Sequence, residues 1–99
     1  RGWTQHDNTD GNGNYCLRAA IGLASGHMIE RDGRVSFRRS ATTDERFAEL
    51  QMVVADLDAK KRVEDCLPSP FKSIPLYNDD PTTTKDDVLA VLDKAIASC

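Results

Sequence analysis

Residues 84–99 read TKDDVLAVLDKAIASC and decide the fold class of this chain. Thr84 is a good N-cap, and the two aspartates that follow it suit the positive end of a helix. Apolar residues then recur at helical spacing, at Val88, Leu92, Ala95, Ile96 and Cys99. The stretch therefore predicts a capped amphipathic helix that buries one face against the rest of the domain.

A first helix is expected directly after a polar loop at residues 4–14. Asn14 is a suitable N-cap, and Gly26 stands where a left-handed residue commonly ends a helix. The predicted buried face of this helix consists of Leu17, Ala20, Ile21 and Ala24.

A longer helix is expected further along, where Thr42 and Glu45 have the spacing of a capping box. Its predicted buried stripe consists of Phe47, Leu50, Val53, Val54 and Leu57. The Lys-Lys-Arg cluster at residues 60–62 is placed in the last turn, where cations complement the negative end of the helix dipole.

Two other segments complete the predicted architecture. Asp32-Gly33 separates two short stretches within residues 28–40 and predicts a turn or weak hairpin. All 4 prolines of the chain fall in residues 67–81, which predicts an extended strap containing Ile74, Leu76 and Tyr77. We expect a mainly α fold, a small bundle of about three helices with this strap and a short hairpin; the alternative is an α+β fold.

Length and composition favour one small domain over residues 1–99, because 99 residues suffice for a single modest core. The chain begins without Met, so we expect that some native residues precede Arg1. A formal charge of -3 argues against duplex nucleic acid as a partner, since phosphate binding needs a basic field. No apolar run approaches the roughly 20 residues that span a bilayer, so no membrane association is expected.

The cysteines predict a reducing, cytoplasmic setting. There are 3 of them, an odd number at wide spacing, unlike the dense even sets of small secreted proteins. With no Cys-x-x-Cys motif and only 2 histidines, the ligands of a structural zinc site are missing. We therefore expect neither a metal nor a cofactor.

Cys16 is the strongest candidate nucleophile, because a thiol in the first turn of a helix lies near unpaired backbone N–H groups that favour thiolate. His6 or His27 would be its base, oriented by Asn78 or Asp79. The alternative is structural: Cys16 is a small buried residue, and the Asn78-Asp79 pair closes a turn before the last helix.

Two groups of candidate binding residues stand apart from these. Arg31, Arg34, Arg38 and Arg39 form a local basic patch that would suit an acidic partner or a small anionic ligand. Trp3 would either anchor the edge of the core or, if exposed, contribute to a binding surface.

A family resemblance runs through four motifs: Gly2-Trp3-Thr4-Gln5, the Tyr-Cys-Leu-Arg-Ala-Ala run at 15–20, Tyr77-Asn78-Asp79, and the helix at 88–96. The chain resembles an uncharacterised domain-of-unknown-function family of actinobacterial and phage proteins. It departs from that family at Ala19, where Gly is frequent, and in the basic stretch at 31–39. Similar proteins begin with another helix before the Gly-Trp pair.

The resemblance implies a bacterial or phage cytoplasmic protein and supplies no catalytic residue. It concentrates at Trp3, Tyr15, Cys16, Asn78 and Asp79, which adds Tyr15 to the binding candidates. We expect a small accessory protein that acts through contact with another protein, since no assembled set of nucleophile, base and oxyanion donors is evident. A thiol-dependent hydrolase or transferase and a sensor of a small anionic ligand are the alternatives, and self-association is left open.

Overall fold

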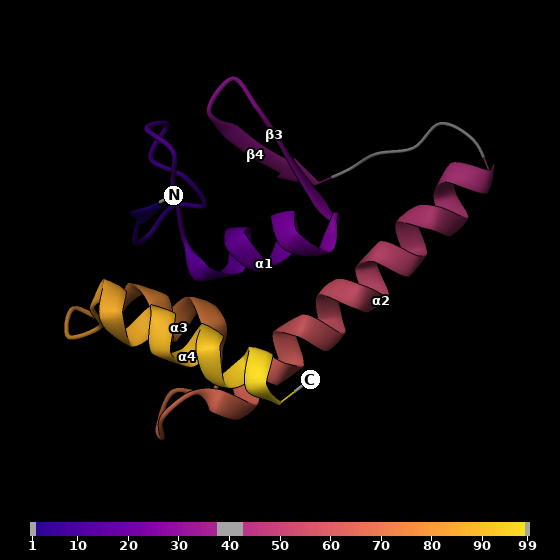
Figure 1. Cartoon of the computed structure of the whole chain (residues 1–99). Coiled ribbons are helices and arrows are strands. Elements are labelled where there is room, and N and C mark those ends of the chain that lie inside the picture. The colour runs from indigo at the N-terminus through magenta and orange to yellow at the C-terminus, as the bar shows by residue number, and fades with distance from the viewer. Residues whose placement is uncertain (1, 38–42, 99) are drawn as a thin grey trace.

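The computed structural model describes residues 2–37 and 43–98, which form four helices and two small sheets. In chain order the elements are β1 (Gly2–Trp3), β2 (Asn14–Tyr15), α1 (Leu17–Ser25), β3 (Met28–Arg31), β4 (Arg34–Phe37), α2 (Thr43–Cys66), α3 (Ile74–Asp79) and α4 (Lys85–Ala97). Figure 1 shows α1, α3 and α4 gathered around the C-terminal part of α2, with the β3–β4 hairpin above α1. The described part of the chain is therefore largely helical, but it has a fourth helix and a second small sheet that were not predicted, and these elements also fit the α+β alternative.

Helix α1 begins and ends at specific capping residues. The predicted N-cap at Asn14 is wrong, because Asn14 lies in β2 and Cys16 caps the helix instead. At the other end Gly26 has a φ of 80°, the left-handed conformation that glycine adopts without strain, and this stop is as predicted. Of its predicted face Leu17 and Ile21 are buried, whereas Ala24 is exposed.

The two sheets hold the N-terminal half of the chain together. Strands β1 and β2 run parallel, with Trp3 beside Tyr15. Strands β3 and β4 form the predicted antiparallel hairpin, with Arg31 beside Arg34. Its turn residues Asp32 and Gly33 both have positive φ, as a two-residue type I′ turn requires.

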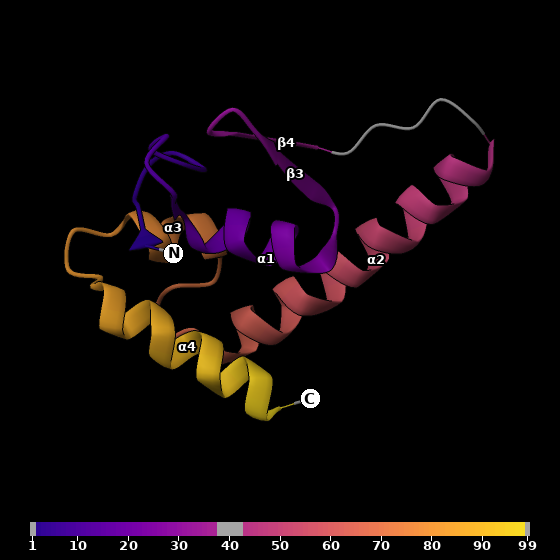
Figure 2. The same cartoon turned by 45° about the horizontal axis from the view of Figure 1, so that its top comes forward.

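Helix α2 contributes only its C-terminal half to the core. Val63 is buried there, and Ala59 and Cys66 pack against the same cluster. The N-terminal half extends away from the other helices in both views (Figures 1 and 2). The Lys-Lys-Arg cluster at 60–62 does not occupy the last turn as predicted, because the helix continues to Cys66. Of the predicted capping box, Thr42 and the side chain of Glu45 lie outside the described residues.

The predicted buried stripe of α2 is wrong. Phe47, Leu50, Val54 and Leu57 are each 56–63% exposed, and only Val53 is half-buried. The helix carries apolar residues on two faces, and the face with Ala59 and Val63 is the one that packs against α1 and α4. A helix with two apolar faces offers no sequence signal for which of them turns inward.

The proline-rich segment also differs from its prediction. Ile74, Leu76 and Tyr77 lie in the short helix α3 and not in an extended strap. Ser73 caps this helix by accepting the N–H of Leu76, and Pro75 occupies its first turn. Proline is tolerated there because first-turn N–H groups have no intrahelical acceptor.

Helix α4 matches the prediction most closely. The Thr84 side chain accepts the N–H of Asp87 while the Asp87 carboxylate accepts the N–H of Thr84, a complete capping box. Val88 and Ala95 are buried as expected, whereas Ile96 is largely exposed and Cys99 lies outside the described residues. The main core consists of Leu17, Ile21, Val63, Ile74, Tyr77, Val88, Val91 and Ala95.

Candidate functional site

Asn78 forms the centre of a buried polar network between the N-terminal segment, α1 and α3. Its Oδ1 accepts the indole N–H of Trp3 at 2.5 Å and the backbone N–H of Leu17 at 2.9 Å. Its amide group donates to the Thr4 carbonyl at 3.0 Å and to Asp79 Oδ1 at 3.0 Å. Only 1% of the residue is exposed, so these bonds satisfy the buried amide.

A small cavity of about 100 Å³, lined mainly by residues with polar side chains, lies beside this network. Its lining residues are His6, Asp7, Asn8, Cys16, Arg18, Pro75, Asn78 and Asp79. Four residues singled out from the sequence, namely Cys16, His6, Asn78 and Asp79, thus line one cavity. His27 does not join them: it follows the C-terminal end of α1, where its ring lies 5.1 Å from that of Phe37.

The Cys16 thiol is held as a helix cap. It donates to Asn8 Oδ1 at 3.5 Å, and its sulfur accepts the N–H of Ala19 at 3.3 Å. Burial raises the pKa of Cys16 above its ordinary value and outweighs the backbone N–H groups of Ala19 and Arg18, which lower it. The thiol is therefore the neutral form at neutral pH, and a neutral thiol is a weak nucleophile.

Asp79 joins the N-terminal loop to α3. Its Oδ1 accepts the backbone N–H of His6 at 2.6 Å, and Oδ2 lies 3.9 Å from His6 Nδ1. Burial tends to raise the pKa of Asp79, but the hydrogen bonds from Asn78 and the His6 backbone outweigh it, so the pKa is lowered. His6 has a φ of 72°, an uncommon conformation for a residue with a Cβ. The carboxylate holds His6 in this conformation.

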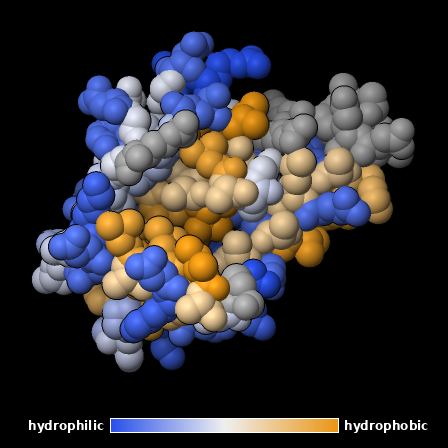
Figure 3. Space-filling view, in the orientation of Figure 1, coloured by the Kyte–Doolittle hydropathy of each residue, from blue (hydrophilic) through white to orange (hydrophobic). Residues whose placement is uncertain are grey.

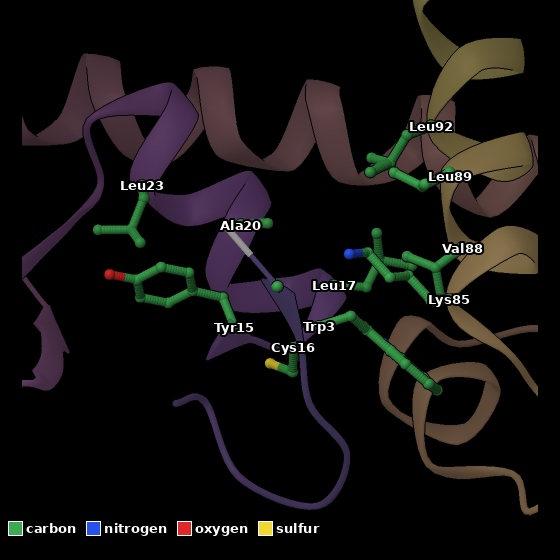
Figure 4. Close-up of a pocket in the computed structure, with 11 residues that line it drawn as sticks. Trp3, Tyr15, Cys16, Leu17, Ala20, Leu23, Lys85, Val88, Leu89 and Leu92 are labelled. Atoms are coloured by element: carbon green, nitrogen blue, oxygen red, sulfur yellow. The ribbon is translucent and has the colours of Figure 1, made fainter. Parts of the chain in front are cut away.

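A second, apolar cavity of about 230 Å³ lies between α1 and α4 (Figure 4). Its lining residues are Gly2, Trp3, Tyr15, Cys16, Leu17, Ala20, Leu23, Lys85, Val88, Leu89 and Leu92. Ala20 and Leu92 also line a wider groove of about 510 Å³ that continues along α2 and includes Ala59 and Val63. Figure 3 shows hydrophobic side chains surrounding the hollow on this side of the molecule.

The exposed apolar residues of α2 form the largest unpredicted feature. We call Phe47, Leu50, Val54 and Leu57 the outer stripe of α2. These residues are spaced by three, four and three positions, the a and d spacing of a helix that packs against another helix. The a and d spacing is visible in the sequence, but this spacing alone does not distinguish a stripe that faces the core from one that faces solvent.

The remaining predicted binding residues are scattered. Trp3 is half-buried against the main core, and Tyr15 is buried with its hydroxyl bonded to the Glu30 carboxylate. Arg31 and Arg34 are exposed beside the hairpin turn. Arg38 and Arg39 lie outside the described residues, so the four-arginine patch stays a prediction. The sequence analysis did not single out Asn8, Arg18 or Lys85 as site residues; of the three, only Arg18 lies in one of the quoted motifs, the run at 15–20.

Residues 2–37 and 43–98 contain neither a membrane-spanning helix nor a cluster of metal-binding side chains. No described helix is both long and apolar enough to cross a bilayer. Among the same residues, no group of three or more His, Cys, Asp or Glu side chains is placed to hold a metal ion.

Comparison with known proteins gives a family but no activity. A family of unknown function, DUF6197, matches residues 1–98, so the chain belongs to that family. No curated protein and no solved structure matches the chain at a significant level.

Proposed function

We propose that this protein is a binding domain whose outer stripe of α2 packs against an amphipathic helix of another protein. The observation that carries the proposal is the exposure of four large apolar side chains at a and d spacing. Isolated apolar residues are normal on surfaces, whereas a contiguous patch of them is typical of an interaction site. Water contact with this patch is unfavourable, and a partner helix would remove it.

The charges beside the outer stripe favour a different protein over a second copy. Arg46 and Lys60 occupy equivalent heptad positions along one edge of the stripe. Antiparallel pairing of two copies about the stripe would place Arg46 of one copy near Lys60 of the other, and like charges repel. A partner helix with carboxylates along the matching edge would pair with both cations. We therefore commit to a heterologous partner of that composition.

The test is site-specific photo-crosslinking in the native host, with a benzophenone side chain in place of Leu50. The matched control carries the same group in place of Asp93, which is exposed on α4. We expect one protein to be captured at position 50 and not at 93. The purified pair should then bind, and Leu50→Glu should weaken that binding about tenfold or more.

Two outcomes would overturn the proposal. A monomer by light scattering with no more capture at position 50 than at 93 would mean that the stripe has no partner. A stable homodimer that Leu50→Glu dissociates would assign the stripe to self-association instead. Because Leu50 is largely exposed, the substitution should leave the melting temperature nearly unchanged, which separates lost binding from lost folding.

Thiol-dependent chemistry is the second candidate function. It is favoured by one observation, that Cys16, His6 and Asp79 line the same cavity. The raised pKa of the Cys16 thiol weighs against it. Rapid alkylation of Cys16 near neutral pH would favour this candidate, whereas slow alkylation would remove it.

A cytoplasmic setting is part of the proposal. Cys16 and Cys66 are both free thiols, as expected of a protein kept in a reducing compartment. The accessory role, the bacterial or phage origin and the location remain predictions that identification of the partner would test together.

A further inference from the structure

The lining of the apolar cavity between α1 and α4 includes one cation, the exposed Lys85. Lys85 is the first residue of α4, at the positive end of the helix dipole, where a cation is electrostatically unfavourable. Figure 4 shows its side chain reaching from α4 toward Leu17 and Ala20 on α1, across the cavity. Within the described part of the chain, no carboxylate forms an ion pair with this ammonium.

The neighbouring acidic residues do not neutralise Lys85. The Asp87 carboxylate accepts the backbone N–H of Thr84 at 3.0 Å, so it is engaged in the capping box. Asp86 is exposed and does not line the cavity. The cavity thus combines apolar walls with a single unpaired positive charge.

Trp3 contributes an apolar ring surface to the cavity. Its indole N–H is already donated to Asn78, so toward the cavity it offers only apolar ring surface. The other large aliphatic residues of the lining are Leu17, Leu23, Val88, Leu89 and Leu92. A ligand that fits these walls has a flexible apolar chain and one negatively charged end.

We propose that this cavity binds a short- or medium-chain aliphatic carboxylate, with the carboxylate at Lys85 and the alkyl chain along Trp3, Leu23 and Leu92. The volume of about 230 Å³ is below the roughly 300–1,000 Å³ typical of pockets for drug-sized ligands, which limits the chain length. The site is separate from the outer stripe of α2, so it does not depend on the proposed protein partner.

Trp3 supplies the readout, because it is the single tryptophan of the chain and lines the cavity. The purified chain of residues 1–99 is titrated with hexanoate, octanoate, decanoate and dodecanoate, each below its micelle concentration. We expect saturable changes in tryptophan fluorescence, with affinity rising about fourfold per added methylene until the cavity is full. Octanol and octylamine, which lack the negative charge, should bind at least about tenfold more weakly than octanoate.

Two substitutions and one control decide the assignment. Lys85→Gln should abolish the preference for octanoate over octanol, whereas Lys94→Gln on the same helix, away from the cavity, should leave it unchanged. Ala20→Leu should fill the cavity and weaken every ligand of the series. Circular dichroism and the melting temperature of each variant check that it is folded.

The proposal is overturned by either of two results. Equal affinity for octanoate and octanol in the wild type, or an unchanged preference in Lys85→Gln, would show that Lys85 recognises no carboxylate. Failure of the whole series to change either the Trp3 fluorescence or the amide resonances of Val88, Leu89 and Leu92 would show that the cavity takes no such ligand.

Discussion

Replacing Asn78 by alanine should destabilise this protein more than most single substitutions. The change removes the acceptor of the Trp3 indole N–H and of the Leu17 backbone N–H, and the donor to the Thr4 carbonyl. Each buried polar group left without a partner costs about 1–3 kcal/mol. The two orphaned donors alone therefore predict a loss of about 4 kcal/mol, before any cavity is counted.

A loss of about 4 kcal/mol is large compared with the total free energy of unfolding of a small domain. A domain of this length has a free energy of unfolding of about 5–15 kcal/mol. Asn78→Ala would therefore either keep only part of this stability or unfold. Urea unfolding followed by Trp3 fluorescence and by circular dichroism measures the difference, with a matched control at Asn12, an exposed residue of the N-terminal loop. Asn12→Ala should change the free energy of unfolding by less than about 0.5 kcal/mol.

A milder variant keeps the experiment informative if Asn78→Ala does not fold. Trp3→Phe removes only the indole N–H and leaves the Oδ1 acceptor and the amide donors of Asn78 in place, so it should be less destabilised than Asn78→Ala when unfolding is followed by circular dichroism. A loss below about 1 kcal/mol for Asn78→Ala would refute the reasoning, because it would mean that water or a local shift satisfies the orphaned groups.

Three further outcomes follow from the burial and pKa of individual side chains. Ile74→Ala should lower the free energy of unfolding by about 2–5 kcal/mol in urea titrations, because this side chain is fully buried. Leu50→Ala on the outer stripe of α2 should change it by less than about 1 kcal/mol, because Leu50 is exposed. Equal losses in the two variants would mean that the stripe is buried. Asp79 has a lowered pKa in the folded state, so its contribution is present above the ordinary value of 3.8 and is lost as the pH falls through the folded value. Asp79→Asn should therefore show a shallower fall of stability in acid than the wild type, and identical profiles would contradict the assignment. Iodoacetamide should alkylate Cys16 more slowly than Cys66 near neutral pH, because burial raises the pKa of Cys16 and Cys66 is less buried. Peptide mapping by mass spectrometry measures both alkylation rates. Faster alkylation of Cys16 than of Cys66 would contradict a neutral Cys16 thiol.

Local signals in the sequence predicted the elements that local chemistry controls. Gly26 ends α1 and Thr84 caps α4, because each effect depends on residues within one turn. The Asp32-Gly33 pair likewise predicted the hairpin. These features could be read without knowing where any other part of the chain lies.

Local signals could not predict which face of α2 is buried, or that part of the proline-rich segment forms a helix. The two apolar faces of α2 are similar in character, and only the positions of α1 and α4 decide that Val63 turns inward while Leu50 turns outward. Four prolines in one segment argue against a long helix, but Pro75 lies in the first turn of the short helix α3, where proline fits.

The candidate site also has features that the sequence indicates and features that only the structure shows. Cys16 and Asn78 could be named from the sequence as polar or reactive residues beside helix ends. Their shared network with Trp3 could not, because it joins residues that are about 60 to 75 positions apart. Lys85 had no motif, and its significance comes only from the apolar cavity that it reaches across.

The network around Asn78 also constrains when the chain can acquire its final form during synthesis. Thr4 and Gln5 bond to groups at Asn78 and Asp80, which are 74 and 75 positions later in the chain. At roughly 5–20 residues per second, the ribosome would need about 4–15 s to make the intervening stretch. Throughout that delay the segment that carries Trp3 lacks its acceptor, so a nascent chain stalled before residue 78 should leave the indole in contact with water.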